Sequence, residues 1–255
     1  MADQKPDVEK GKLSEIESHY RNLYTKEAVQ YDATRFNHER GQHFNTKEQQ
    51  AIHKLLDLPA GNTLLDVPTG TGRIGAYMAE QGLQVTGFDI TRNMMLEARK
   101  LAESWELGNK FVFVEGNGRE LPFPTASFDG VMSIRFFHLL PTPLHRPFVV
   151  DMWRVVKPGG TLLIQYDSAL TGGGLITWPR EAHRRLIKKH KPRYYFWPHQ
   201  LASVFEGIPY EVHGFSVPGS RFLSAKGADF VENLVATGVK GFLANRVFVK
   251  AVKPL

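Results

Sequence analysis

Residues 64–91, LLDVPTGTGRIGAYMAEQGLQVTGFDIT, join two short apolar runs through a glycine-containing loop and an amphipathic stretch. The first run ends at Asp66, the loop holds Gly70 and Gly72, and the second run ends at Asp89. A strand, a crossover helix and a second strand in this order form a βαβ unit, which builds a parallel sheet. Because ligands of such open sheets bind at the carboxyl ends of the strands, this segment indicates both the fold class and the place of the site.

The alternation of apolar runs and amphipathic stretches continues along most of the chain. The predicted strands cover residues 63–67, 84–88, 110–114, 130–134, 161–166, 210–217 and 246–252. The predicted helices cover residues 12–30, 44–56, 73–81, 92–105, 143–155, 198–207 and 225–237. We expect an α/β fold, a Rossmann-like, doubly wound and mostly parallel sheet of seven strands with helices on both faces. An antiparallel edge strand, N-terminal helices and a helical cap insertion complete it.

The glycine loop permits two interpretations. Residues 70–75, GTGRIG, match the GxGxxG pattern of dinucleotide-binding proteins, which favours an NAD(P)-dependent oxidoreductase. Asp66 argues against this function, because a carboxylate at the end of the strand would repel a pyrophosphate a few ångströms away. A cofactor that carries an ammonium and a sulfonium group would be attracted instead.

Four motifs in register resemble those of class I S-adenosylmethionine-dependent methyltransferases, of the small-molecule, type 11-like kind. They are LDVPTGTGR (65–73), GFDIT with NMMLEARK (87–100), EGNGRELPFPTASFDGV (115–131) and WRVVKPGGTLLI (153–164). Together they cover residues 64–166. The resemblance implies S-adenosylmethionine as cofactor and S-adenosylhomocysteine as product.

Two residues depart from the family pattern. Pro68 stands where the first motif usually has glycine, and since proline lacks an N–H, a contact there must use its carbonyl oxygen. Asn117 stands where the family often has an aspartate near the adenine amino group. An amide oxygen can still accept that hydrogen bond.

The resemblance implies a cofactor-binding set in which Asp66, Gly70 and Gly72 lie along the methionine part and Asp89 binds the ribose hydroxyls. The set is Tyr31, Asp66, Pro68, Gly70, Thr71, Gly72, Asp89, Ile90, Met94, Asn117, Gly118, Ile134 and Arg135. Simpler roles stay open: core packing for Ile90 and Met94, a helix N-cap for Asp89, and a helix-end anchor for Tyr31.

His138, just past strand 130–134, is the candidate general base, since histidine titrates near neutral pH. The alternative is that His138 only packs locally. The candidate substrate-binding residues are Phe136, Tyr166, Tyr194, Tyr195 and Trp197. Asp167 and Ser168 are further candidates for the same pocket, or ordinary loop residues. The histidines show no ligand spacing, and we expect no metal.

The length of 255 residues is within the range of one elaborated α/β domain. We expect a helical lid in residues 1–57, a cofactor-binding core in 63–168, and a cap with sheet-closing strands in 169–255. The chain has no cysteine, which excludes thiolate catalysis and cysteine metal sites. It has no apolar run of roughly 20 residues and no apolar signal core near Met1, so we expect a cytoplasmic protein.

The charge excess lies in one segment. The net charge is +6, and residues 180–193 hold seven basic residues and one acid, which accounts for all of it. A single basic segment argues against a broad nucleic-acid-coating surface. We therefore expect methylation of a small-molecule acceptor on oxygen or nitrogen. The alternatives are an RNA methyltransferase that docks through residues 180–193, and a non-catalytic cofactor-binding protein.

Overall fold

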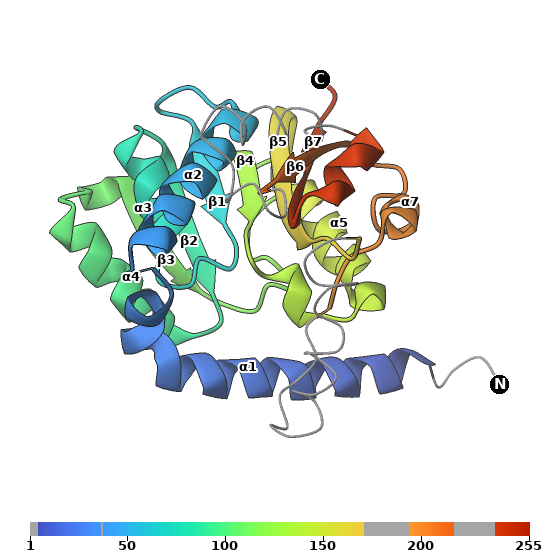
Figure 1. Cartoon of the computed structure of the whole chain (residues 1–255), viewed down its shortest axis with the longest axis horizontal. Helices are drawn as coiled ribbons and strands as arrows, with labels where there is room; N and C mark the ends of the chain where they lie inside the picture. The colour runs from blue at the N-terminus through green and yellow to red at the C-terminus, as the bar shows by residue number, and fades with distance from the viewer. Residues whose placement is uncertain (1–4, 37, 171–193, 217–237) are drawn as a thin grey trace. The chain divides into compact units, whose positions relative to one another are not determined.

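The structure, a computed structural model, describes residues 5–36, 38–170, 194–216 and 238–255. The helices are α1 (Lys5–Phe36), α2 (Glu39–Leu56), α3 (Arg73–Glu80), α4 (Arg92–Ser104), α5 (His145–Val155) and α7 (Leu201–Val204). The strands are β1 (Thr63–Asp66), β2 (Gln84–Asp89), β3 (Phe111–Glu115), β4 (Phe128–Ser133), β5 (Val156–Asp167), β6 (Glu211–Phe215) and β7 (Arg246–Val252) (Figure 1).

The seven strands form a mixed sheet in the order β3-β2-β1-β4-β5-β7-β6. The pairs β1/β2, β2/β3 and β4/β5 are parallel, whereas β7 runs antiparallel to both β5 and β6. This is the expected Rossmann-like α/β fold, with the expected antiparallel closure. The chain divides into two compact units, residues 1–122 and 123–255, and each is described by itself below.

The first unit holds β1 to β3 and the helices α1 to α4. Close packing of α3 against its neighbours depends on glycine at two positions. A Cβ at Gly75 would lie 2.5 Å from the Phe111 ring, and one at Gly72 would lie 2.8 Å from Ala98. Gly72 also has φ +75°, in the left-handed region that favours glycine. Gly72 and Gly75 are therefore required by the packing of the unit itself.

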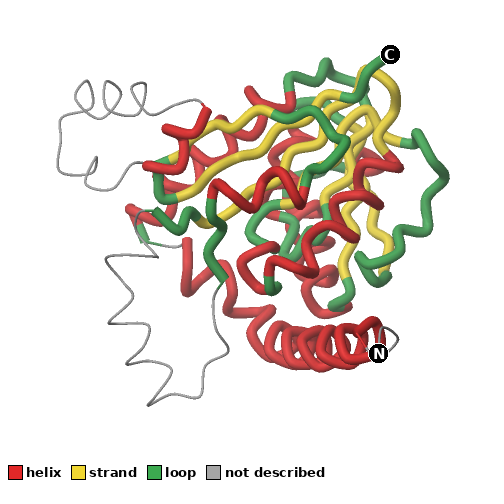
Figure 2. The backbone as a smooth tube through the Cα atoms, turned by 90° about the vertical axis from the view of Figure 1, so that its right-hand side faces the viewer, coloured by secondary structure: helices red, strands yellow, loops and turns green. Residues whose placement is uncertain are grey.

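Helix α1 is the long red helix beside the N label in Figure 2, and it packs on α4 and α2. It is longer than the predicted helix 12–30, because no proline or glycine stands between Lys12 and His38 to end it. Ile16 and Ala28 are buried on it. The helix therefore continues past Tyr31.

The second unit holds β4 to β7 with α5 and α7. Strand β5 begins before the predicted 161–166, because Gly159 N–H donates to Lys253 O at 2.8 Å and so extends the pairing with the chain after β7. Gly159 has φ +78°, which suits the third position of a type II turn in which Pro158 takes the second.

Several predicted boundaries shift by a few residues. Lys110 lies in a 3₁₀ turn, Gly108–Lys110, rather than in strand 110–114. The predicted helix 198–207 is a 3₁₀ turn, Pro198–Gln200, followed by the single turn of α7. The predicted helix 225–237 and the basic segment 180–193 lie outside the described residues.

Candidate functional site

Two buried carboxylates end the neighbouring parallel strands β1 and β2. Asp66 is 2% exposed and Asp89 is 5% exposed. Asp66 Oδ2 accepts a hydrogen bond from Thr69 Oγ1 at 2.8 Å. Asp89 Oδ2 accepts one from the Gly70 N–H at 2.8 Å, and its Oδ1 accepts one from the Thr91 N–H at 2.7 Å. Asp66 therefore holds the loop after its own strand, whereas Asp89 holds both that glycine loop and the start of the chain after β2.

The protonation of this acid pair is set by its burial. Burial raises the pKa of Asp66 to about 7; the Thr69 hydrogen bond opposes this shift and the negative charge of Asp89 adds to it. Burial also raises the pKa of Asp89, against the hydrogen bonds from Thr91 and Gly70. Such a pair stabilises a cationic group brought near it and repels a phosphate.

The glycine loop between β1 and α3 leaves room for a ligand at one position. Gly70 has φ +56°, and a Cβ built there would meet nothing within 4 Å. The neighbouring Thr71 is buried, and its Oγ1 donates to Asp32 Oδ1 of α1 at 3.0 Å. Pro68, half-buried, precedes this loop and follows a cis peptide bond. The open side of Gly70 and the acid pair fit a cofactor that has cationic groups.

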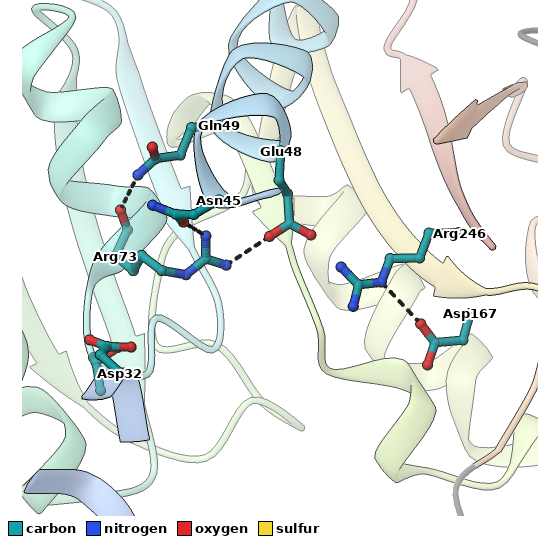
Figure 3. Close-up of polar contacts among 8 residues, drawn as sticks. Asp32, Asn45, Glu48, Gln49, Arg73, Asp167 and Arg246 are labelled. Carbon is teal, nitrogen blue, oxygen red and sulfur yellow. Dashed lines mark hydrogen bonds and ion pairs between the residues drawn. The ribbon is translucent and has the colours of Figure 1, made fainter. Parts of the chain in front are cut away.

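The start of α3 is held by α2 through a buried ion pair that the sequence did not reveal. Arg73 Nη2 lies 2.9 Å from Glu48 Oε2, and its Nη1 donates to Asn45 (Figure 3). Gln49 Nε2 donates to the Arg73 carbonyl oxygen at 3.0 Å. The guanidinium also lies over the Phe36 ring, 4.4 Å from its centroid. Glu48 is fully buried, and nothing in its local pattern marks it as such.

Helix α1 contacts the chain that follows each of the three strands of this unit, in a loop after β1 and β3 and at the start of α4 after β2. Besides the Asp32–Thr71 bond after β1, the Thr25 carbonyl oxygen accepts from Asn93 Nδ2 at 3.1 Å, just after β2. After β3, Glu17 Oε2 accepts from Asn117 Nδ2 at 3.3 Å. The sequence predicted a helix over residues 12–30 and a cofactor contact at Tyr31. It did not predict the contact of Glu17.

The remaining predicted cofactor residues of this unit lie on or beside the same loops. Ile90 and Gly118 are half-buried, whereas Met94 is buried in α4. Tyr31 is half-buried; Arg35 lies 3.9 Å over its ring, and Tyr24 contacts its edge. Their contacts with a cofactor stay predictions.

In the second unit, the chain after β4 carries the candidate base. Ile134 is buried, and Arg135 has φ +58°, an uncommon conformation for a residue with a side chain. His138 lies half-buried in the 3₁₀ turn Phe137–Leu139, and its carbonyl oxygen accepts from the Tyr194 N–H at 2.9 Å. Backbone pairing therefore brings two of the predicted acceptor-site segments together.

The other predicted substrate-binding residues differ in how exposed their side chains are. Phe136 and Tyr195 are half-buried, whereas Trp197 is 40% exposed. Tyr166 is fully buried and stacks on Phe196 with ring centroids 4.0 Å apart.

The Tyr166 hydroxyl has no hydrogen-bond partner among the described residues, and the same holds for Ser133 Oγ and His145 Nδ1. His145 contacts the Tyr166 ring at a centroid distance of 5.6 Å, and its Nε2 donates to the Leu140 carbonyl oxygen at 2.9 Å. Burial lowers the pKa of His145 to about 4. The sequence offered no signal for this histidine, which lies in the predicted helix 143–155.

Asp167 and Ser168 both make structural contacts at the end of β5. Asp167 Oδ1 lies 3.5 Å from Arg246 Nε of β7 (Figure 3), and Ser168 Oγ donates to the Phe242 carbonyl oxygen. Across the described ranges, no group of histidine and acidic side chains could hold a metal ion. None of the helices in those ranges is long and apolar enough to cross a membrane.

Comparisons with known proteins agree with this geometry. The family described as "Methyltransferase domain" matches residues 64–160. The demethylmenaquinone methyltransferase of Tropheryma whipplei is 35% identical over 121 residues, which are 46% of this chain and 46% of the relative. That of Listeria welshimeri is 36% identical over 121 residues, 46% of this chain and 50% of the relative. The chain thus spans about half the length of the curated relatives it matches.

Solved structures share the fold at low identity. An S-adenosylmethionine-dependent methyltransferase from Thermotoga maritima has a TM-score of 0.63 and 16% identity, over 91% of this chain and 99% of that one. The cyclase SpnF has a TM-score of 0.58 and 20% identity, over 82% and 80% of the two chains. Because a cyclase shares the fold, function must be argued from the site. The family match covers the strands and loops that carry both buried carboxylates, so residues 64–160 of this chain are similar to a methyltransferase domain.

Proposed function

We propose that this chain transfers a methyl group from S-adenosylmethionine to a small-molecule acceptor, on oxygen or nitrogen. The observation that carries the proposal is the acid pair Asp66 and Asp89, buried at adjacent strand ends beside the open side of Gly70. A dinucleotide would bring a pyrophosphate toward these carboxyls, whereas an ammonium and a sulfonium group complement them. The same argument disfavours an NAD(P)-dependent oxidoreductase.

In the proposed site, Asp66 lies nearest the methionine part and Asp89 takes the ribose diol. The Gly70 and Thr91 N–H groups each engage one oxygen of Asp89, so that each oxygen keeps a further lone pair for a ribose hydroxyl. When bound, the cofactor supplies a methyl group on a positively charged sulfur, which is already activated for displacement. The chain must then position the acceptor and exclude water.

His138 is the proposed base that takes a proton from the acceptor atom. It lies half-buried after β4, whereas His145 is buried and its lowered pKa, near 4, keeps it neutral at physiological pH. His145 Nδ1 and the Tyr166 hydroxyl, both buried without partners among the described residues, are proposed to bind a polar group of the acceptor. A small molecule is favoured because the Tropheryma relative is named for demethylmenaquinone, a small-molecule acceptor.

The test is methyl transfer from labelled S-adenosylmethionine into a cell extract, which is then separated into RNA, protein, lipid and small-molecule fractions. Demethylmenaquinone, a lipid-soluble quinone that would be recovered in the lipid fraction, serves as one defined acceptor in a parallel assay; its methylation would make a ring carbon the accepting atom in place of oxygen or nitrogen. Label in small molecules is the expected result. Label in RNA would overturn the acceptor class and make residues 180–193 the docking segment. Binding of S-adenosylhomocysteine without any transfer would favour a non-catalytic binding protein.

A further inference from the structure

We propose that Glu17 of α1 accepts the hydrogen bond from the adenine amino group and thereby selects an adenine-bearing cofactor. This inference rests on the cofactor proposed above. It assigns recognition of the adenine base to a residue of α1 about fifty positions before the glycine loop, and not to the loop after β3 alone.

The Glu17 carboxylate accepts a hydrogen bond through one oxygen and not through the other. Its Oε2 accepts from Asn117 Nδ2 at 3.3 Å. Its Oε1 is buried and lacks a hydrogen-bond partner among the described residues; it forms an ion pair with Arg119 Nε at 3.8 Å, a distance beyond hydrogen-bond range. A buried carboxylate oxygen in this state is stabilised by any N–H donor that reaches it.

Asn117 is oriented from both ends of its amide. Its Oδ1 accepts from the Arg119 N–H at 3.0 Å while its Nδ2 donates to Glu17. The carboxylate can only accept and the backbone N–H can only donate, so the chemistry of the neighbours fixes this orientation. The amide oxygen expected to meet the adenine therefore already accepts one hydrogen bond, whereas Glu17 Oε1 beside it accepts none among the described residues.

The position along the sheet edge suits a base. Strand β2 ends at Asp89, where we place the ribose, and Asp89 is in register with Glu115 of β3. The Gly116 N–H donates to the Asp89 carbonyl oxygen at 3.0 Å, so the loop that leads to Asn117 starts directly beside the ribose acid. A nucleoside held by Asp89 would extend its base toward Asn117 and Glu17.

A carboxylate discriminates more sharply than an amide. Hydrogen bonds from N–H groups to ionised acceptors are roughly twice as strong as neutral ones. A hypoxanthine base presents a carbonyl oxygen where adenine presents its amino group. This oxygen has no hydrogen to donate to the Glu17 carboxylate, and the two oxygens would repel each other. The chain should therefore distinguish the two bases strongly.

The experiment is calorimetric binding of S-adenosylhomocysteine and of S-inosylhomocysteine to the full chain. We expect the wild type to prefer the amino ligand by about tenfold or more. Glu17→Gln should reduce the preference to about twofold or less, because an amide pairs with either base. Glu15→Gln, which removes an exposed carboxylate from the same helix, is the matched control and should keep the preference.

A double variant tests which residue supplies the hydrogen-bond acceptor for the adenine amino group. Adding Asn117→Asp to Glu17→Gln returns a carboxylate to the same place and should restore the preference. The inference is overturned if Glu17→Gln keeps the wild-type preference, or if it weakens both ligands by the same factor, which would make Glu17 a packing contact of α1. Failure of the wild type to bind either ligand would overturn the proposed cofactor itself.

Discussion

In the first unit, the buried acids Asp66, Asp89 and Glu48 all accept hydrogen bonds from neighbouring groups. In the second unit, by contrast, Tyr166 Oη and His145 Nδ1 are buried without partners among the described residues. Glu17 of the first unit also accepts a hydrogen bond through Oε2, but its buried Oε1 has no such bond among the described residues. With the proposed site assignments, a cofactor would meet mostly preorganised groups, whereas an acceptor would complete groups that have no hydrogen-bond partner among the described residues.

The largest effect is expected at His138, the proposed general base. His138→Ala should lower methyl transfer by about 10²- to 10⁴-fold, the usual contribution of a general base. Affinity for S-adenosylhomocysteine should stay unchanged, since His138 is proposed to act on the methyl acceptor and not to bind the cofactor. Label incorporation and calorimetry measure the two quantities, with the exposed His199→Ala as control. Normal transfer by the His138 variant would leave this histidine a packing role.

Breaking the satisfied network of the first unit should strongly destabilise it. Arg73→Met leaves the fully buried Glu48 without its cation, which should lower the free energy of unfolding by about 3–5 kcal/mol. Glu48→Gln in the same background should recover part of the loss. Chemical denaturation of the four proteins in the cycle measures the coupling, and additive effects would contradict the ion pair.

The two units should respond to pH with opposite signs. Folded Asp66 binds its proton up to about pH 7, against 3.8 in the unfolded chain, so its contribution to stability is lost as the pH rises between these values. Folded His145 binds its proton only near pH 4, against 6.5 when unfolded, so its contribution is lost as the pH falls between these values. The two slopes oppose each other between about pH 4 and 6.5.

Removing either group should change the slope in the direction set by the other. Relative to the wild type, which shares the contribution of Asp89, the free energy of unfolding of Asp66→Asn should gain about 2–4 kcal/mol as the pH rises through this window, and that of His145→Asn should lose about as much. Denaturation at several pH values measures both. Parallel profiles for the two variants would contradict the assignment of opposite linkages.

A smaller effect is expected at Asp89, the acid proposed to bind the ribose hydroxyls. Asp89→Ala should weaken S-adenosylhomocysteine binding by about 1–3 kcal/mol through the loss of charged hydrogen bonds. The N–H groups of Gly70 and Thr91 lose their acceptor at the same time, so circular dichroism must confirm folding. Exposed Asp57→Ala is the control. Unchanged affinity in folded Asp89→Ala would limit this acid to shaping the loops.

The smallest effect tests the open groups of the acceptor half. Tyr166→Phe removes a buried hydroxyl that has no partner in the described chain, so the free energy of unfolding should rise by up to about 1 kcal/mol. Thermal unfolding measures this change, with Tyr210→Phe as an exposed control. A loss of stability would show that the hydroxyl is bonded in solution.

The sequence predicted what local patterns determine. Strand β1, the glycine loop and β2 follow from apolar runs and turn residues, and the two acids follow from their place at strand ends. It missed contacts that depend on tertiary packing. The ion pair of Glu48 with Arg73 joins residues 25 positions apart, and the bond of Glu17 with Asn117 joins residues 100 apart. No local periodicity marks such partners, because each depends on which helix face meets which loop.

The three contacts of α1 also bear on the order of folding. They join residues 39, 68 and 100 positions apart along the chain. During synthesis this helix emerges before its three partners, and the last of them, Asn117, follows Glu17 by 100 residues, roughly 5–20 s at usual translation rates. An isolated helix is only marginally stable in water. Helix α1 should therefore dock last in its unit, after all three strands are paired.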